Sequence, residues 1–277
     1  MAISGLNLES CFSGVYRGKT VFVTGHTGFK GGWLVLWLKA LGAKVVGYSL
    51  APSTQPSLFG AVRVGDEINH IIGDIRDFPH LSSAMADCRP DIVFHLAAQP
   101  LVRRSYQEPR ETYETNIMGS INVLESVRQL PQVRVCINVT SDKCYENRES
   151  KIPYRENDAM GGHDPYSSSK GAVEVVAAAY RRSFFSDART ALVSVRAGNV
   201  IGGGDWSEDR IIPDCIRALS AGHPIEVRNP EAVRPWQHVL EPLSGYLLLG
   251  SLLWNDPVGY DYGWNFGPQT VPGYSRG

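Results

Sequence analysis

The chain has 277 residues, of which 43% are hydrophobic and 20% are charged, and its 27 Lys and Arg against 28 Asp and Glu give a formal net charge of −1 at pH 7. This composition predicts a globular protein with a sizeable core and excludes a disordered chain. The balanced charge, without runs of Lys and Arg, gives nucleic-acid binding no support.

Short apolar runs alternate with amphipathic stretches along the first two thirds of the chain. The apolar runs predict strands at residues 20–24, 44–48, 68–72, 91–96, 133–140 and 190–196. The amphipathic stretches predict helices at residues 29–41, 78–88, 111–128 and 166–186. This alternation is typical of βαβ units, in which helices cover both faces of a parallel sheet. We therefore predict a doubly wound α/β domain over residues 18–196, preceded by an N-terminal tail at residues 1–17.

The character of the sequence changes after residue 196, where Gly, Pro and Trp become frequent and the periodic segments shorten to residues 211–222 and 239–254. We interpret residues 197–277 as a smaller, substrate-binding domain. Ligands of open α/β sheets bind beyond the carboxyl ends of the strands, so such a domain would close a cleft there.

The first predicted strand runs into a glycine-rich loop and then into the first predicted helix. The loop has the spacing G-x-x-G-x-x-G and consists of Gly25, His26, Thr27, Gly28, Phe29, Lys30 and Gly31. Glycines let the backbone turn sharply and approach a pyrophosphate, while the helix N-terminus supplies N–H donors and a favourable dipole. The arrangement predicts dinucleotide binding. His26 and Lys30 either contact phosphate or are simply solvated.

Further cofactor contacts are expected where the next strands end. The second strand closes as Ser49-Leu50, without the carboxylate that usually binds the adenosine ribose, so this rule does not decide between NAD and NADP. After the third strand, Asp74 could accept a hydrogen bond from an adenine amino group, with Ile75 beside it. After the fourth strand, small residues would let the backbone lie close to the cofactor, in the segment Leu96, Ala97 and Ala98.

The strongest catalytic pattern is Tyr166-Ser167-Ser168-Ser169-Lys170. Asp164 and Pro165 predict a helix start, which places Tyr166 and Lys170 one turn apart on the same face. A nearby ammonium group lowers the pKa of a tyrosine from about 10, so that Tyr166 could take a hydroxyl proton as a hydride leaves. Ser141, after the fifth strand, could hydrogen-bond the same hydroxyl.

Other classes of site and location find little support. The seven histidines show no H-x-x-x-H pattern and no pairing with cysteine at metal-ligand spacing, so no metal site is predicted. The five scattered cysteines are typical of reduced thiols in a cytoplasmic protein. The longest apolar runs fall short of the about 20 residues that a membrane span needs. The N-terminus lacks the pattern of a secretory signal.

Seven segments between residues 18 and 268 resemble the extended short-chain dehydrogenase/reductases that act on nucleotide sugars, and among them the branch that acts on CDP-sugars. They read GHTGFKGGWL, GDIRD, HLAAQPLVRRSY, TSDKCYENRE, GGHDPYSSSKG, RAGNVIGGGDW and VRPWQHVLEPLSGYL. The resemblance implies a Rossmann-like fold, NAD as cofactor, CDP-glucose as substrate and a homodimer. It also implies a place in deoxysugar biosynthesis, such as that of lipopolysaccharide O-antigen.

The resemblance further implies a redox-neutral loss of water from the sugar. Tyr166 would deprotonate the 4-hydroxyl, Lys170 would lower the pKa of Tyr166 and hold the nicotinamide ribose, and Asp142 would protonate the departing 6-hydroxyl. The dTDP-sugar branch has a Glu at the next position to remove the carbon-5 proton, whereas this chain has Lys143. A lysine acts as a base only if its pKa, about 10.4, is lowered. Lys143 is our predicted base, with Glu146 or a water molecule as alternatives.

Substrate contacts are implied for Ser105, Asn199, Arg210 and Arg234, and arginine suits bidentate binding of a diphosphate. The alternative is that both arginines are ordinary surface residues. Two other functions stay open, namely a nucleotide-sugar 4-epimerase, which has no use for Asp142, and a nucleotide-binding remnant without turnover. The tail QTVPGYSRG is short and polar, so we expect the substrate domain to be truncated at the C-terminus.

Overall fold

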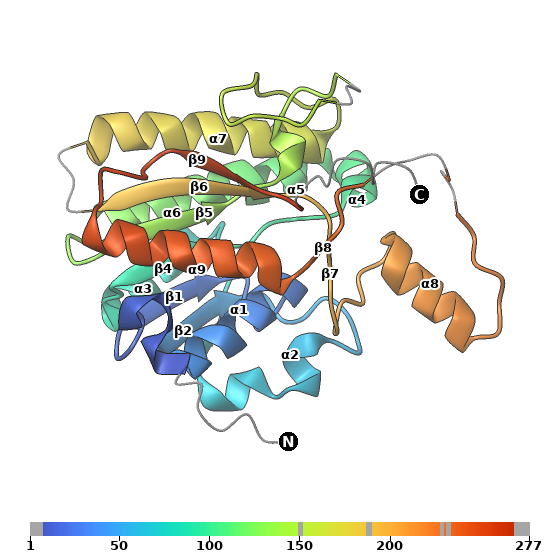
Figure 1. Cartoon of the computed structure of the whole chain (residues 1–277), viewed down its shortest axis with the longest axis horizontal. Coiled ribbons are helices and arrows are strands. Elements are labelled where there is room, and N and C mark those ends of the chain that lie inside the picture. Colours follow the sequence, from blue (N-terminus) through green and yellow to red (C-terminus); the bar gives the residue numbers. More distant parts are fainter. Residues whose placement is uncertain (1–7, 149–151, 187–189, 228–229, 231–233, 269–277) are drawn as a thin grey trace.

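The computed structural model describes residues 8–148, 152–186, 190–227, 230 and 234–268. The tail at 269–277, for which truncation was predicted, and residues 1–7 lie outside the described residues. Among the described residues, seven parallel strands form one sheet in the order β3-β2-β1-β4-β5-β6-β9 (Figure 1). The strands are β1 Thr20–Thr24, β2 Lys44–Ser49, β3 Asn69–Ile72, β4 Ile92–His95, β5 Val135–Val139, β6 Ala191–Ala197 and β9 Gly263–Phe266. The predicted doubly wound α/β fold is confirmed.

Helices cover both faces of this sheet, and most begin and end close to their predicted bounds. The long ones are α1 Phe29–Ala40, α3 Phe78–Cys88, α6 Gly119–Arg128, α7 Pro165–Phe184 and α9 Leu240–Asn255. The helix predicted at 111–128 consists of α5 Pro109–Tyr113, a π-helical turn Glu114–Met118, and α6. Shorter helical elements are Leu8–Gly14, α2 Leu58–Ala61, Val64–Glu67, α4 Val102–Gln107, Asp142–Cys144 and α8 Ile211–Ser220.

Two apolar cores lie on opposite faces of the sheet, because successive strand residues point to opposite sides. In β1, Val23 belongs to the core formed with α1 and α9, whereas Phe22 belongs to the core formed with α3, α6 and α7. Both side chains have no exposed surface. The strands are thus apolar on both faces, which is why they appear in the sequence as continuous apolar runs.

The last strand of the sheet comes from the part of the sequence that we assigned to the smaller domain. β9 pairs with β6, and α9 packs against β5 and β6, so this segment returns to the large sheet. The sequence Gly-Trp-Asn-Phe is only half-buried and lies among glycines, which explains why it was not predicted as a strand. The domain boundary at residues 196 and 197 stays a prediction.

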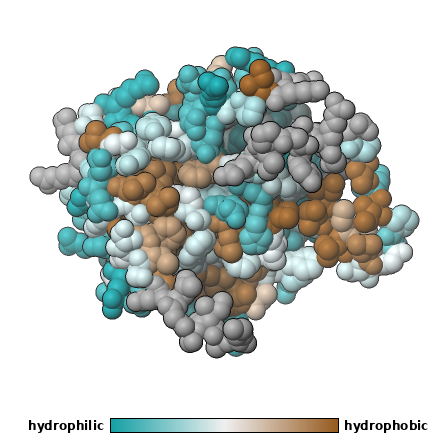
Figure 2. All heavy atoms as spheres, viewed as in Figure 1, coloured by the Kyte–Doolittle hydropathy of each residue, from teal (hydrophilic) through white to brown (hydrophobic). Residues whose placement is uncertain are grey.

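A smaller lobe lies beside the sheet at the end of the molecule where α8 is labelled (Figure 1). It contains α8 and a two-stranded sheet of β7 Val200–Ile201 and β8 Gln237–His238. Figure 2 shows apolar side chains gathered over α8, where the exposed ones are Ile211, Ile212, Ile216 and Leu219. No helix within the described ranges is long and apolar enough to cross a membrane.

Candidate active site

The predicted site residues meet at the carboxyl edge of the sheet, around the ends of β1, β4 and β5. The strand order reverses between β1 and β4, since β2 follows on one side of β1 and β4 lies on the other. Such a reversal opens a crevice between the loops that leave the two strands, and ligands of open α/β sheets bind there. The topology therefore places the glycine-rich loop at the expected ligand crevice.

The glycine-rich loop is packed so tightly that two of its glycines cannot carry a side chain. A Cβ on Gly25, whose φ is +77°, would lie 2.7 Å from the Ala97 nitrogen. A Cβ on Gly31 would lie 2.1 Å from the Gly25 carbonyl oxygen. Gly28 is the N-cap residue of α1 and, as a glycine, has no side chain that could cap the helix. The first N–H groups of α1 are therefore left for an anion such as a pyrophosphate, and the loop fits a dinucleotide.

Side-chain hydrogen bonds tie this loop to its neighbouring strands. Thr27 Oγ1 lies 2.8 Å from Ser49 Oγ and donates to the Leu50 carbonyl oxygen at 2.9 Å. Thr24 Oγ1 accepts from the backbone nitrogens of Leu96 and Ala97 at 3.1 and 3.2 Å. The predicted contact segment Leu96, Ala97 and Ala98 is thus held directly against the glycine-rich loop.

Solvation was one of two alternatives for His26 and Lys30, and the structure rules it out for His26. His26 is fully buried, and its Nε2 lies 2.6 Å from His70 Nδ1. Burial, and next the neighbouring His70, lower the pKa of His26 to about 4, so the ring is neutral at pH 7. Burial and the Arg210 charge lower the pKa of Lys30 to about 8, while Asp142 raises it. The solvated alternative is therefore wrong for His26, and Lys30 lies within electrostatic range of the catalytic segment.

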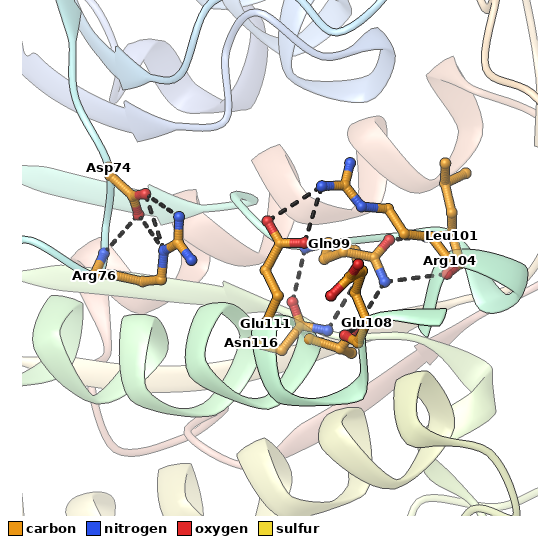
Figure 3. Close-up of polar contacts among 9 residues, drawn as sticks. Asp74, Arg76, Gln99, Leu101, Arg104, Glu108, Glu111 and Asn116 are labelled. Carbon is orange, nitrogen blue, oxygen red and sulfur yellow. Dashed lines mark hydrogen bonds and ion pairs between the residues drawn. The ribbon is translucent and has the colours of Figure 1, made fainter. Parts of the chain in front are cut away.

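Asp74 and Ile75 follow β3 as predicted, and each has a partner within the protein. The Asp74 carboxylate accepts hydrogen bonds from the backbone and the guanidinium of Arg76 (Figure 3). Burial would raise the pKa of Asp74, but these hydrogen bonds outweigh it and hold the pKa below its usual value. Ile75 is buried against Gly119, where a Cβ would lie 2.5 Å from the Ile75 side chain. An adenine contact of Asp74 stays a prediction.

The start of α7 has the predicted capping geometry and presents the two main catalytic candidates. Asp164 Oδ1 accepts a hydrogen bond from the Ser167 nitrogen at 2.9 Å, and Pro165 is the first residue of the helix. Tyr166 and Lys170 are both buried on the inner face of α7. Lys170 Nζ donates to the Val139 carbonyl oxygen at 3.4 Å, which fixes the ammonium group at the end of β5.

Burial has the largest effect on the pKa of both groups. Burial raises the pKa of Tyr166 to about 12, a hydrogen bond to Ser141 lowers it, and Asp142 raises it. Among the charged groups, Arg210 also lowers the pKa of Tyr166. The expected lowering by Lys170 stays a prediction. Burial also lowers the pKa of Lys170 to about 8, while Glu174 raises it.

The other catalytic candidates occupy a short 3₁₀ turn after β5. Ser141 Oγ donates to Asp142 Oδ1 at 3.0 Å and accepts from the Lys143 nitrogen at 3.2 Å. This places Ser141 between Asp142 and Tyr166, to which it also hydrogen-bonds. The Lys143 side chain is exposed, as is that of Glu146, so the burial that would favour a lysine base is lacking here. The identity of the carbon-5 base stays a prediction.

The predicted substrate residues lie in different settings. Arg210 is the N-cap residue of α8 and forms an ion pair with Asp205 at 3.0 Å. Its charge acts on both Tyr166 and Lys30. Arg234 is exposed, and Asn199 accepts at its carbonyl oxygen from the Gln237 nitrogen. Ser105 is fully buried in α4 and donates its hydroxyl to the Val102 carbonyl oxygen at 2.6 Å. Of these four, Arg210 is thus the residue whose charge acts on Tyr166.

Three polar residues near the site were missed by the sequence analysis. Asn116 lies in the π-helical turn, accepts from the Gln99 nitrogen at 2.8 Å and donates to Ser169 Oγ at 2.8 Å. Gln99 in turn hydrogen-bonds Leu101 and Thr112, so the network joins the loop after β4 to α5 and the π-helical turn (Figure 3). An Asn inside a predicted helix was the available signal, and π-helical turns are frequent at functional sites.

A third missed residue, Tyr246, lies on α9 beside the same site. Its ring is fully buried, and Lys30 Nζ lies 5.8 Å from the ring centroid. Its pKa is raised by burial first and then by Asp142 and Tyr166. The Tyr246 hydroxyl has no hydrogen-bond partner among the described residues. Such an orphaned polar atom beside the catalytic residues also fits a site that takes a bound group.

Comparisons with known proteins agree with this geometry. Residues 21–252 match the model of the NAD dependent epimerase/dehydratase family. The chain is 55% identical to the CDP-glucose 4,6-dehydratase of Salmonella typhimurium over 92% of its own length and 72% of that protein. It is 31% identical to the UDP-glucose 4-epimerase of Mycolicibacterium smegmatis over 60% of this chain and 52% of that protein.

A solved structure is also similar in three dimensions. MoeE5 in complex with UDP-glucose and NAD superposes with a TM-score of 0.73 at 26% identity, covering 90% of this chain and 76% of that one. The shared fold, the glycine-rich loop at its switch point and the sequence match over most of the chain lead to one conclusion. The chain belongs to the NAD dependent epimerase/dehydratase family.

Proposed function

We propose that this chain is a CDP-glucose 4,6-dehydratase, a lyase that converts CDP-D-glucose to CDP-4-dehydro-6-deoxy-D-glucose. The observation that carries the proposal is the 55% identity to such an enzyme over 92% of the chain. The match to a 4-epimerase is weaker, at 31% over 60% of the chain. The position of Asp142 beside Ser141 supports the same choice, because elimination of water needs an acid that epimerisation does not.

The reaction begins with oxidation at carbon 4 of the sugar. Tyr166, in the phenolate form, takes the proton of the 4-hydroxyl, and Ser141 hydrogen-bonds the same oxygen. NAD, when bound, supplies a nicotinamide ring that accepts the hydride from carbon 4 and later returns it to carbon 6. Lys170, placed at the end of β5 by Val139, holds the nicotinamide ribose and stabilises the phenolate. The cofactor loop comprises Gly25, His26, Thr27, Gly28, Phe29, Lys30 and Gly31.

The 4-ketone then makes the neighbouring proton on carbon 5 acidic, so that water can leave across carbons 5 and 6. Asp142 gives a proton to the departing 6-hydroxyl, and the carbon-5 proton passes to Lys143. Glu146 and a water molecule are the other candidates for this base. The hydride adds back at carbon 6 and a proton returns to carbon 5, so the net change is loss of one water molecule without net oxidation.

The diphosphate and the nucleotide would lie under the smaller lobe. Arg210 supports this assignment, because its guanidinium charge acts on Tyr166 and Lys30 and so reaches the site from the N-terminus of α8. A fork of N–H donors suits a diphosphate. Arg234 and Asn199, on the chain flanking β7 and β8, are further proposed contacts, and Ser105 is proposed to lie near the sugar.

The proposal is tested by incubating the protein with CDP-glucose and NAD and following the mass of the sugar nucleotide. We expect loss of one water molecule and a 4-keto-6-deoxy product, with much slower reaction of dTDP-glucose and UDP-glucose. A Tyr166→Phe variant should lose the activity. Clean formation of the 4-epimer would overturn the dehydratase assignment in favour of an epimerase. Absence of any turnover, with NAD binding retained, would favour a nucleotide-binding remnant.

We further propose a homodimer that works in the cytoplasm in deoxysugar biosynthesis, such as that of lipopolysaccharide O-antigen. Exposed apolar side chains on neighbouring helical elements support the dimer, since Tyr113, Met118 and Val175 are 38%, 51% and 62% exposed. The turn Glu114–Met118 contacts α7, so these side chains belong to one helical surface. Light scattering should give twice the mass of the chain, and a Val175→Arg variant should give the monomer mass.

A further inference from the structure

A buried charged residue on α7, Glu174, lies one helical turn beyond Lys170 and has no role in the reaction described above. Its side chain is 5% exposed and forms an ion pair with Arg196, whose side chain is 6% exposed. Arg196 Nε and Nη2 donate to the two Glu174 carboxylate oxygens at 2.9 and 2.7 Å. Thr140 Oγ1 donates to Glu174 Oε1 at 2.5 Å. The carboxylate is therefore fixed from β6 and from the residue that precedes Ser141.

The same ion pair reaches the far end of the catalytic turn. Arg196 Nη1 donates to the Tyr145 hydroxyl at 2.6 Å, and that hydroxyl donates to Asn265 Oδ1 at 2.7 Å. In the sequence, Thr140 precedes and Tyr145 follows the segment that contains Ser141, Asp142 and Lys143. Both ends of this segment are therefore hydrogen-bonded to the buried ion pair of Glu174 and Arg196. A Cβ on Gly263 would lie 2.3 Å from Arg196 Nη2, so the glycine in β9 leaves the space that the arginine side chain occupies.

We propose that Glu174 is a positioning residue for the reaction, which sets where Ser141, Asp142 and Lys143 lie relative to Tyr166 and Lys170. The inference rests on the proposed function for the identity of the reaction, but the contacts that carry it do not depend on the substrate. Glu174 shares helix α7 with Tyr166 and Lys170, and through Thr140 and Arg196 it holds the opposing segment. One carboxylate thus joins the two halves of the catalytic machinery.

The charge of Glu174 has a second effect, on Lys170. Glu174 raises the pKa of Lys170, opposing the burial that lowers it. The charged and titratable groups on which Glu174 acts are Lys170 and Arg181 of α7, Arg196 of β6 and Cys144 of the catalytic turn. The ammonium form of Lys170 exists below its pKa of about 8 and is lost above it. Without the Glu174 charge, this loss moves to lower pH.

The first test separates positioning from stability by using two threonines on the same pair of strands. Thr140→Val removes the hydrogen bond to Glu174 while the Glu174 carboxylate keeps its ion pair with Arg196. Thr140→Ser keeps the hydroxyl group and therefore the hydrogen bond. Thr190→Val is the matched control, because Thr190 is equally buried and donates to the Val133 carbonyl oxygen at the opposite end of β5 and β6. We expect a similar loss of stability in both valine variants. The kcat should fall about tenfold in Thr140→Val alone, with KM unchanged and recovery in Thr140→Ser.

The second test uses Glu174→Gln, which keeps the shape and removes the charge. The alkaline limb of the kcat profile should move to lower pH by about one unit, whereas Thr140→Val should leave it in place. NAD binding, followed by fluorescence without substrate, should lose affinity at a pH lower by the same amount. This measurement needs no turnover, so it tests the effect of the Glu174 charge on Lys170 even if Glu174→Gln has no activity. It also holds if the wild-type protein does not convert CDP-glucose.

Two outcomes overturn the inference. Equal kcat values in Thr140→Val and Thr190→Val would show that the bond to Glu174 does not position the catalytic segment. An unshifted alkaline limb of NAD binding in Glu174→Gln would show that its charge does not act on Lys170. Failure of the wild-type protein to dehydrate CDP-glucose, with the NAD-binding shift present, would instead overturn the proposed function and leave the role of Glu174 standing.

Discussion

The carboxylate of Asp142 lies beside Gly198, and a side chain at that position would press against it. A Cβ on Gly198 would stand 3.0 Å from Asp142 Oδ2 and 2.8 Å from Pro235 Cγ. Gly198 directly follows β6, so the chain that leaves the sheet here forms one wall around the proposed general acid. The other wall is Ser141, which donates to the opposite carboxylate oxygen.

Gly198→Ala should therefore displace Asp142 and slow the elimination of water. A shift of the acid by a fraction of an ångström to 1 Å is expected to lower kcat about 10- to 100-fold, with little effect on KM. The measurement is the rate of 4-keto-6-deoxy product formation. Gly203→Ala is the control, because no described atom lies within 4 Å of a Cβ at that position. Equal activity of the two variants would show that Gly198 does not set the position of the acid.

The carbon-5 base can be identified by hydrogen exchange. Lys143 is exposed and lies in the turn directly after Asp142, so its side chain could contact a substrate bound over this turn. In deuterated solvent, the wild-type enzyme should introduce deuterium at carbon 5, and Lys143→Ala should lower this exchange at least about tenfold. Lys44→Ala, at an exposed lysine at the start of β2, should have no effect. Unchanged exchange in Lys143→Ala would assign the role to Glu146 or to water.

The parts of the fold that follow from local pattern could be predicted from the sequence. The first strand was predicted at residues 20–24 and is observed at Thr20–Thr24, because five apolar or β-branched residues stand directly before Gly25. The start of α7 was likewise predictable, since Asp164 and Pro165 are a cap and a first residue in the sequence itself. β9 was not predictable, because its pairing with β6 is a tertiary contact that a half-buried four-residue segment does not reveal.

The candidate site divides in the same way. The spacing of Tyr166 and Lys170 fixed their common helix face, and the glycine pattern located the cofactor loop. The pKa of Tyr166 depends on burial and on Asp142, Asp164 and Arg210, which come together only in the folded chain. The link from Glu174 to Arg196 joins residues 22 positions apart on different elements, and no local pattern signals it. Sequence reasoning thus predicted the reacting groups but not the residues that hold them in place.

Loss of either partner of the ion pair between Arg196 and Glu174 should strongly destabilise the protein, because the other charge would stay buried without a partner. Arg196→Met leaves a buried carboxylate without its counter-charge, which is expected to cost about 3–5 kcal/mol of unfolding free energy. Arg128→Met removes a pair with Glu125 whose side chains are 42% and 25% exposed. That loss should be much smaller, because water screens the charges of an exposed pair. Urea unfolding of the two variants measures the difference, and equal losses would contradict the expected cost of the buried charge.

Two buried histidines should make the protein less stable in mild acid. Burial and then Lys170 lower the pKa of His95 to about 3, and burial and then His70 lower that of His26 to about 4. In the unfolded chain each has a pKa of about 6.5, so between pH 6.5 and pH 4 the unfolded state binds more protons than the folded state. Stability from both groups is therefore present above about pH 6.5 and is lost as the pH falls, by about 2 kcal/mol for each at pH 5.

A histidine variant tests this dependence directly. His95 Nδ1 lies 2.7 Å from Thr24 Oγ1 and its Nε2 lies 2.9 Å from Ser120 Oγ, so His95→Asn should lower stability at pH 7 through lost hydrogen bonds. The difference in unfolding free energy between pH 7 and pH 5 should nevertheless shrink by about 2 kcal/mol, because one of the two titrating groups is gone. His223→Asn, at an exposed position, should leave that difference unchanged. If His95→Asn keeps the full pH difference, His95 is not a source of the acid sensitivity.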